Sequence, residues 1–533
     1  MKSDPSRLYH HFMPCNRDPV CSWLILLLAG LLVHGCAVNP VTGKNELSLV
    51  SEASEIRIGD KQYLPTQQSQ GGLYSVDVGL SQYVNEVGKR LAQASDRQLP
   101  YEFVVLNDSV ANAWALPGGK IAVTRGLLLR LSSEAELAAV LAHEIVHAAA
   151  RHGAKTIERG TLLQGALMAA SMRLDKNQDR YGNMIMGSAQ LGAQLISQSY
   201  SRSAELEADQ FGILYMARAG YDPNAAVSLQ ETFVVLSQSQ KQTWLSELFA
   251  SHPPSQERVN RNKQTVFELQ KTIRGDFEVG ADRYQEKLTY LASKSEAYRA
   301  FDKARQAIHQ GDLTAADQQI RTAIREEPKE PRFFGLQGEI AYENKQYLSA
   351  MAHYKTALKI DPNYYEYYLG KGLVLFKLGR KQAAISDLKK SNQLLPNAVA
   401  THALGEISLE QGNKQAAKEY FRAVMKGSGS QAETAKLQFV KLDITANPQA
   451  YVDIQTLVRD QEIILKVTNS TPLEITQMSI VISIESQDES RQKTVSLRYL
   501  KGYQDKLLKT GIRPVPSIPI AIGTRIKAIH LSS

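Results

Sequence analysis

The chain has 533 residues, of which 43% are hydrophobic and 22% are charged. This length accommodates three or four domains, and the composition is that of a globular protein rather than a disordered or fibrous one. The formal net charge of +8 is spread along the chain instead of being gathered into a basic tract. That distribution argues against a nucleic-acid-binding protein, so no nucleic-acid partner is predicted.

The N-terminus resembles the export signal of a bacterial lipoprotein. The apolar run at 23–33 (WLILLLAGLLV) has the length of a signal peptide and is too short to span a bilayer comfortably. Gly35 and Cys36 follow it in the arrangement of a lipoprotein cleavage site. Residues 1–35 are therefore predicted to be removed as a signal peptide, which leaves Cys36 as the lipidated N-terminus. An uncleaved N-terminal anchor is the alternative.

The cysteine pattern agrees with an exported protein. The other two cysteines, Cys15 and Cys21, lie inside the predicted signal peptide. The processed chain would keep neither a free thiol nor a disulfide, which suits an oxidising compartment. Ala37 follows Cys36, and in lipoproteins of this kind a residue other than Asp at that position implies sorting to the outer membrane.

The segments after the signal predict a tether and then a small mixed unit. Residues 36–75 are polar and turn-rich, and they predict a lipidated tether with a first helix that begins after Ser51 or Ser54. Residues 76–95 have the apolar spacing of a second helix. Two short strands are predicted next, at residues 101–106 and 120–124.

An alanine-rich helix follows, with Ser133 as its N-cap and Gly153 as its predicted end. Within it, His143 and His147 lie four residues apart and therefore on one face. Two imidazoles at this spacing can bind one metal ion, with Glu144 beside them as the general base. This H-E-x-x-H pattern is typical of zinc metalloproteases, and the alternative is an ordinary helix that happens to carry two histidines.

A catalytic zinc site needs a third protein ligand, and Glu205 is the best candidate for it. Glu205 lies early on a helix predicted from about 203 to 219, and Asp209 lies one turn later on the same face. Asp209 is placed to accept the free N–H of a ligand histidine, which would orient that ligand. Glu207 is rotated by roughly 200° from both and is expected to face away. The alternative is a solvated acidic helix face.

The later sequence predicts two further kinds of structure. Two apolar or amphipathic helical segments between 162 and 198 are either core helices, helices covered by a partner, or helices that touch a membrane without crossing it. Residues 296–430 repeat with a period of 34, marked by Pro328, Pro362 and Pro396, which is typical of a tetratricopeptide α-solenoid. Tyr364, Tyr365, Tyr367 and Tyr368 either line its groove or pack between its helices. Residues 450–533 are β-rich and predict a small β-sandwich-like domain.

Four stretches carry a resemblance to a known family: NAWALPGGKIAVTRGLL, LAAVLAHEIVHAAARHG, SRSAELEAD and SHPPSQERVNR. In this order, across roughly residues 45–265, they resemble family forty-eight of the zinc metallopeptidases. The signal sequence and the repeats are similar to its periplasmic BepA type. The resemblance implies a multidomain protein whose residues 76–275 form a mainly α zincin-type (gluzincin) metalloprotease domain with a small β edge, and it also implies Glu205 as the third zinc ligand.

The resemblance implies roles for two loops. In such proteins the His of a His-Pro loop can occupy the open zinc position, so His252 would be a latch that excludes substrate. The alternatives are that His252 stabilises the oxyanion of the tetrahedral intermediate, or that it is an ordinary loop residue. The hairpin at 112–124 would form the edge of the cleft, where a substrate peptide pairs with it or Asn112 binds its backbone. A purely structural hairpin is the alternative.

The predicted function is zinc-dependent endopeptidase activity in the cell envelope. One zinc ion per chain is expected on His143, His147 and Glu205, with Glu144, Asp209 and His252 as catalytic residues. By resemblance, the protein would be held by lipid on the periplasmic side of the outer membrane of a Gram-negative bacterium. It would cleave misfolded or stalled envelope proteins, and its repeats would recruit clients or the outer-membrane assembly machinery. The rival hypothesis is a periplasmic chaperone or assembly adaptor with a regulatory or rarely active zinc site.

Overall fold

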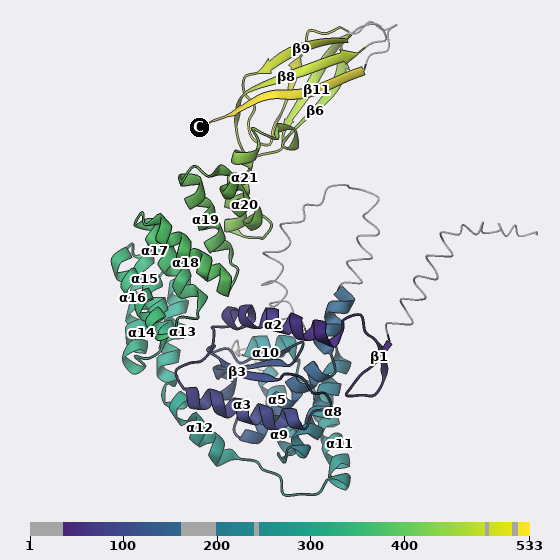
Figure 1. The fold of residues 1–533 in the computed structure, drawn as a ribbon, viewed down its shortest axis with the longest axis vertical. Helices are drawn as coiled ribbons and strands as arrows, with labels where there is room; N and C mark the ends of the chain where they lie inside the picture. The colour runs from purple at the N-terminus through teal and green to yellow at the C-terminus, as the bar shows by residue number, and fades with distance from the viewer. Residues whose placement is uncertain (1–35, 161–198, 239–244, 486–489, 514–520, 533) are drawn as a thin grey trace, which may run out of the picture.

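The computed structural model describes residues 36–160, 199–238, 245–485, 490–513 and 521–532 (Figure 1). The predicted multidomain class is confirmed: a helical part around a small sheet is followed by helical repeats and then by antiparallel sheets. Within the described ranges, no helix combines the length and the apolar character that crossing a membrane requires. The predicted signal peptide and the two apolar segments between 162 and 198 lie outside the described residues.

The first described range contains a two-stranded hairpin, two helices and a three-stranded sheet. Their bounds are β1 (Cys36–Val38), β2 (Asn45–Leu47), α2 (Glu52–Ser69), α3 (Val78–Gln93), β3 (Glu102–Leu106), β4 (Ala113–Leu116), β5 (Lys120–Thr124) and the short α4 (Arg125–Leu128). Ser51 is the N-cap of α2 and accepts a hydrogen bond from Ser54 N. The sheet has the order β3-β5-β4, in which β3 pairs parallel with β5 and β4 pairs antiparallel with it. This places β4 at the edge of the sheet.

The helices beside this sheet carry the predicted site. They are α5 (Glu134–Ala149), α8 (Arg202–Arg218), α9 (Asn224–Ser237), α10 (Ser246–Ser251), α11 (Gln256–Thr272) and α12 (Ala281–Ser293). Ser133 is the N-cap of α5, as predicted, and its hydroxyl accepts from Glu136 N. Alanine fills α5 and nearly all of the helix is buried, so α8 and the sheet pack closely on either side of it.

The predicted end of this helix at Gly153 is wrong. Helix α5 stops at Ala149, the chain turns at Ala150 and Arg151, and residues 152–160 form a separate helical segment. Arg151 has a φ of 64°, which is uncommon for a residue other than glycine. Its guanidinium binds the buried carboxylate of Glu55 on α2. A contact with a residue 96 positions away stabilises this turn, and local helix propensity does not include such a contact.

The repeats follow this part in the sequence and form a continuous stack of paired helices (Figure 1). Their bounds are α13 (Ser295–His309), α14 (Leu313–Glu326), α15 (Pro331–Glu343), α16 (Tyr347–Ile360), α17 (Tyr365–Lys377), α18 (Lys381–Leu394), α19 (Ala398–Glu410), α20 (Lys414–Val424) and α21 (Ser430–Asp443). Small residues let the helices approach: a Cβ on Gly338 would lie 2.9 Å from the ring of Tyr354. Tyr364 and Tyr367 are buried, so these two tyrosines pack between elements.

The first repeats share one hydrophobic core with the N-terminal part. Tyr298 and Phe301 of α13 and Phe333 of α15 belong to the same buried cluster as the residues of α3 and α5. The guanidinium of Arg125, itself only 2% exposed, lies 3.6 Å from the centre of the Tyr298 ring. Burial of large apolar and aromatic groups across this boundary holds the two parts together.

The C-terminal part is a small sandwich, as predicted. It consists of η2 (Pro448–Ala450), β6 (Val452–Arg459), β7 (Glu462–Asn469), β8 (Ile475–Glu485), β9 (Ser490–Leu497), β10 (Asp505–Lys509) and β11 (Ala521–Leu531). Two antiparallel sheets have the orders β10-β7-β6 and β11-β8-β9. Buried residues of both sheets, among them Leu465 and Ile480, form one core.

Candidate metal centre

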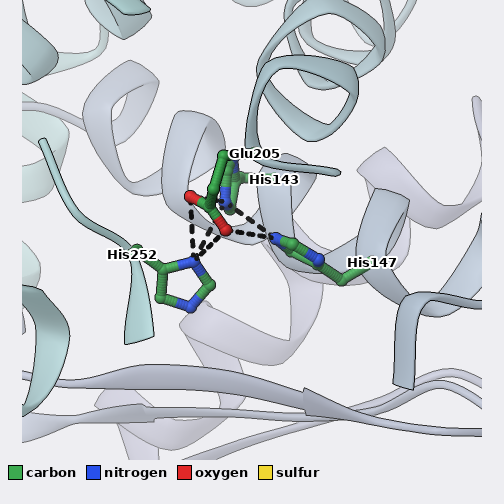
Figure 2. A group of neighbouring side chains, drawn as sticks. All are labelled: His143, His147, Glu205 and His252. Carbon is green, nitrogen blue, oxygen red and sulfur yellow. Dashed lines mark hydrogen bonds and ion pairs between the residues drawn. The ribbon is translucent and has the colours of Figure 1, made fainter. Parts of the chain in front are cut away.

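Four side chains from three separate segments of the chain converge at one point (Figure 2). His143 and His147 come from α5, Glu205 from the first turn of α8, and His252 from the residue that ends α10. One ligand atom from each lies within 4.8 Å of all the others. The Nε2 atoms of the two α5 histidines are 3.0 Å apart, and His147 Nε2 is 3.4 Å from Glu205 Oε1.

The packing of α5 against α8 sets this geometry. The i and i+4 positions of His143 and His147 place both imidazoles on the face that meets α8. Gly212 and Ala208 allow the two helices to lie close, since a Cβ on Gly212 would be 3.2 Å from His143 N. The close approach brings the Glu205 carboxylate within reach of both imidazoles.

The donor set fits a zinc ion. Two imidazoles and one carboxylate are the ligands of many catalytic zinc sites, and a ligand imidazole has to be neutral. Burial is the largest influence on His147 and lowers its pKa well below the usual value, which favours the neutral form. Burial alone would raise the pKa of Glu205, but the neighbouring histidines hold it well below its ordinary value. Glu205 is therefore ionised, as a metal ligand requires.

A carboxylate and an arginine contact the candidate metal ligands from outside the cluster. His143 Nδ1 lies 2.9 Å from Asp209 Oδ1, the contact expected for a residue that orients this imidazole. Arg258 of α11 donates from Nε and Nη2 to both oxygens of Asp209 at 2.7 Å. Its Nη1 is 2.8 Å from Glu205 Oε2. Arg258 thus connects the candidate third ligand to the residue that orients the first.

Sequence reasoning did not single out Arg258. The residue belongs to the stretch SHPPSQERVNR, six positions after His252, and it is 6% exposed. A buried arginine is rare unless it is paired, so its burial marks it as part of the centre. Its position in the sequence, on a highly charged helix, does not distinguish it from a solvated arginine.

Glu144 lies beside the cluster with half of its carboxylate unpaired. Its Oε1 is 3.4 Å from His252 Nε2, and among the described residues its Oε2 has no hydrogen-bond partner. Burial raises the pKa of Glu144, partly offset by the nearby His252 and His143. A carboxylate with a raised pKa and a free oxygen can take up a proton at a pH closer to neutral.

His252 lies inside the cluster rather than on an ordinary surface loop. Its Nδ1 is 3.1 Å from Glu205 Oε1, and its other ring nitrogen faces Glu144. The ring therefore lies between the candidate third ligand and the candidate base. Helix α10, whose C-cap is His252, is fixed to the sheet region through Glu247. The Oε2 of Glu247 accepts from Asn112 Nδ2 and from Gln70 Nε2, both at 3.2 Å.

The predicted cleft edge is covered in this arrangement. All four residues of the edge strand β4 are buried. Asn112, just before it, donates its side-chain amide to Glu247, and its backbone N–H donates to Thr124 Oγ1 at 2.9 Å. Pairing of a substrate with this strand stays a prediction, and it would require the residues that bury β4 to move.

Comparison with known proteins agrees with this centre. Residues 80–266 match the sequence model of peptidase family M48, and residues 338–379, 365–397 and 400–426 match tetratricopeptide repeat models. The mitochondrial metalloendopeptidase OMA1 of Schizosaccharomyces pombe is 31% identical over 274 residues, which cover 49% of this chain and 77% of that protein. The chain belongs to peptidase family M48. It is accordingly a metallopeptidase, a hydrolase of peptide bonds.

Two bacterial relatives extend the similarity of this M48 peptidase. The beta-barrel assembly-enhancing protease of Escherichia coli K12 is 25% identical over 384 residues, covering 71% of this chain and 74% of that protein. The putative beta-barrel assembly-enhancing protease of Vibrio cholerae is 39% identical over 153 residues, which cover 28% of this chain but only 32% of that protein. The first of these matches extends well beyond the length of the M48 region.

A cavity of about 60 Å³ adjoins the centre of the M48 peptidase. Glu144 and His252 line one side, and the other walls are mostly apolar, formed by Val140, Ile213, Met216, Leu229, Phe233 and Leu248. Gln230 and Asn262 also line it, and their Nε2 and Oδ1 atoms have no partner among the described residues. The cavity suits a mainly apolar group with a polar end.

Proposed function

We propose that the protein is a zinc-dependent endopeptidase that cleaves misfolded or stalled proteins of the bacterial envelope. The observation that carries the proposal is the buried cluster of His143, His147 and Glu205 with Glu144 beside it, whose Oε2 has no partner in the part of the chain that the structure describes. Membership of family M48 gives the reaction class. The name of the Escherichia coli relative, a protease that enhances β-barrel assembly, supports an envelope client.

The residues divide the chemistry between them. His143, His147 and Glu205 would hold zinc, which when bound supplies a Lewis acid that polarises a carbonyl and acidifies water. Glu144 accepts the proton of the attacking water on its free Oε2 and passes it to the leaving amine. Asp209 holds the His143 ring in place by accepting from Nδ1, and Arg258 fixes Asp209.

We further propose that His252 keeps the site closed. Its ring contacts Glu205 through Nδ1 and Glu144 through Nε2, so it occupies the space that a substrate carbonyl and the attacking water need. Leu248, from the same helix, lines the neighbouring cavity. Movement of α10 would therefore open the reaction site and the adjoining cavity together. The side chain next to the scissile bond would then enter this cavity, which favours an apolar residue there.

The place of action and the partners complete the proposal. Lipid attachment at Cys36 would hold the protein on the periplasmic side of the outer membrane, and the repeats would recruit clients or an outer-membrane assembly complex. The repeats support protein binding because tetratricopeptide arrays present an extended concave surface. An adaptor with a seldom active site is the second candidate function, and the contact of His252 with Glu144 favours it.

Substitution of Glu144 tests the peptidase proposal. The Glu144→Gln protein should retain about one zinc per chain but cleave an unfolded outer-membrane protein at least about 100-fold more slowly, because it lacks the general base. Zinc is measured by elemental analysis and cleavage by gel densitometry. Glu268→Gln, an exposed change on α11, is the matched control and should behave as wild type. Equal cleavage by Glu144→Gln and wild type, or wild-type protein without zinc, contradicts the proposal.

A further inference from the structure

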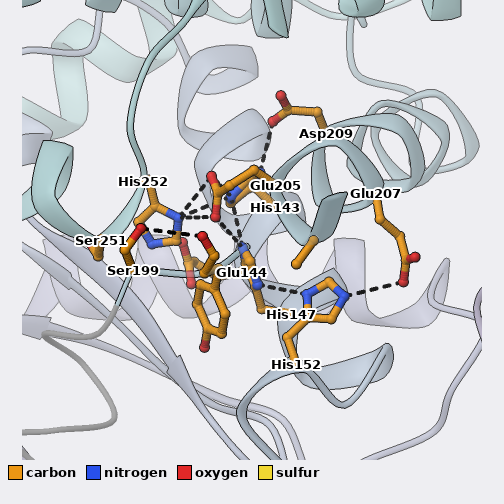
Figure 3. A network of polar contacts seen from close by, with 12 residues as sticks. His143, Glu144, His147, His152, Ser199, Glu205, Glu207, Asp209, Ser251 and His252 are labelled. Atoms are coloured by element: carbon orange, nitrogen blue, oxygen red, sulfur yellow. Dashed lines mark hydrogen bonds and ion pairs between the residues drawn. The ribbon is translucent and has the colours of Figure 1, made fainter. Parts of the chain in front are cut away.

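A second histidine lies directly behind the ligand candidate His147 (Figure 3). His147 Nδ1 is 2.8 Å from Nδ1 of His152, and His152 Nε2 is 3.2 Å from Oε1 of Glu207. All three groups are shielded, with 4% of His152 and 22% of the Glu207 side chain exposed. The three side chains form a line that leads away from the metal centre.

The two contacts fix where the protons lie. His147 directs Nε2 into the cluster, so as a neutral metal ligand it carries its proton on Nδ1. That proton has one nearby acceptor in this line, the unprotonated Nδ1 of His152. His152 then carries its own proton on Nε2 and donates it to the Glu207 carboxylate. Each contact obtains one donor and one acceptor, and no group in the line is left unsatisfied.

The turn at Arg151 makes this arrangement. On a continuous helix, His152 would be rotated by roughly 140° from His147 and could not face it. Because α5 ends at Ala149 and Arg151 has a positive φ, the chain reverses enough for the two imidazoles to meet edge to face, with ring centres 4.9 Å apart. Helix α8 supplies Glu207 from the opposite side.

Helix α8 thus contacts both histidines of α5 through acidic residues on two different faces. Asp209 binds His143 directly, whereas Glu207 reaches His147 through His152. Glu207 does face away from the cluster, as its spacing from Glu205 and Asp209 predicts. This orientation nevertheless brings Glu207 to His152, which contacts His147 on the side away from the cluster.

We propose that His152 and Glu207 are positioning residues of the metal centre, which fix the tautomer and the ring orientation of His147 and thereby strengthen zinc binding. This inference rests on the proposed zinc site. A carboxylate–histidine pair behind a ligand imidazole raises the basicity of that ligand and removes its rotational freedom. Removal of such outer groups typically weakens metal binding by about 10- to 100-fold.

Zinc competition between the purified full-length protein and a colorimetric chelator tests the inference. His152→Phe keeps a planar ring but has no acceptor for His147 Nδ1–H, so zinc affinity should fall by about 10- to 100-fold. His152→Asn places a carbonyl oxygen near the former Nδ1 and should recover most of the affinity. Glu207→Ala, at a partly exposed position, should weaken zinc binding by a smaller factor, about 3- to 10-fold. Glu231→Ala, on the exposed side of α9, is the control and should leave zinc affinity unchanged.

Two further measurements separate positioning from folding. The near-ultraviolet circular dichroism of the zinc-free variants should match that of wild type, and the visible spectrum of cobalt-substituted Glu207→Ala should shift from that of wild type. If wild type binds zinc and both His152→Phe and Glu207→Ala bind it equally tightly, the inference is overturned while the proposed function stands. If wild type binds no zinc, the proposed function itself fails.

Discussion

Asn107, directly after strand β3, donates its side-chain amide to both carboxylate oxygens of Glu330, the N-cap of α15, at 2.9 and 3.0 Å. The two residues are 223 positions apart, and both are buried. Tyr298 of α13 donates its hydroxyl to the same carboxylate at 2.8 Å. This shared acceptor connects the peptidase sheet to two consecutive repeats.

Glu330→Ala should destabilise the whole chain and not only the repeats. It leaves the Asn107 amide and the Tyr298 hydroxyl buried without an acceptor, which costs on the order of 2–4 kcal/mol. The expected result is a lower midpoint of urea unfolding, followed by intrinsic fluorescence. Glu326→Ala, an exposed change at the end of α14, should leave the midpoint within error. Equal unfolding midpoints for the two variants would show that the Glu330 carboxylate contributes little to the stability of the chain.

His252→Ala should raise basal cleavage of an unfolded protein. The His252 ring contacts both Glu205 and Glu144, so under the proposed latch role its removal would open the site to substrate. Loss of a latch held by one or two hydrogen bonds shifts the closed–open equilibrium by about 1–3 kcal/mol, or about 5- to 100-fold. Initial rates on a fluorescent casein substrate measure the change, with the exposed His530→Ala as the control. A lower rate would instead favour the transition-state role.

Arg258→Met should lower both zinc content and thermal stability. The guanidinium contacts Asp209 and Glu205, so its removal leaves two buried carboxylates without their arginine partner, at a cost of about 3–5 kcal/mol. Arg258→Lys keeps the charge but not the bidentate contact with Asp209. Its zinc content and thermal stability should therefore lie between those of Arg258→Met and wild type. Elemental analysis and scanning calorimetry measure the two effects. Arg261→Met, on an exposed position of α11, should match wild type; zinc retention by Arg258→Met would contradict the assigned role.

Glu339 should make stability depend on pH. Partial burial against the groove between repeats, together with the charges of Glu366 and Glu343, raises the pKa of Glu339 to about 7. Between the unfolded value of 4.5 and this value, the folded chain keeps a proton that the unfolded chain loses, so stability falls as pH rises. Glu339→Gln should therefore raise the melting temperature at pH 8 but not at pH 4.5. The increase in melting temperature is small because the Glu339 side chain is partly exposed. A difference in melting temperature that does not change with pH would contradict the prediction.

The predictable part of the site follows from spacing along regular helices. His143 and His147 share a face by helical geometry, and the position of Glu205 and Asp209 one turn apart predicted which acidic residues face the centre. The contacts of these residues in the structure agree with those expectations, and their roles in catalysis stay predictions. The tetratricopeptide period likewise predicted paired helices, because small residues and prolines recur at fixed positions where helices cross and end.

The remaining part depends on contacts between distant segments. The turn at Arg151 forms around Glu55, so a sequence reading that extends the helix to Gly153 places His152 on the wrong side. Arg258 is recognised as part of the centre by its burial, which becomes visible only in the folded structure. Similarly, the apolar positions of Phe301 and Phe333 predict packing within the repeats, but they do not predict that these rings also fill the core of the peptidase.

That common core has a consequence for how the enzyme is made. Phe333 lies 81 residues after His252, so every residue of the candidate metal centre leaves the ribosome before the core that includes Phe333 is complete. A chain that folds from its N-terminus acquires its final packing only after the second repeat has emerged. We therefore expect the nascent enzyme to lack a fully packed cleft until the second repeat has folded against it. Its biogenesis would delay proteolysis until the first two repeats are in place.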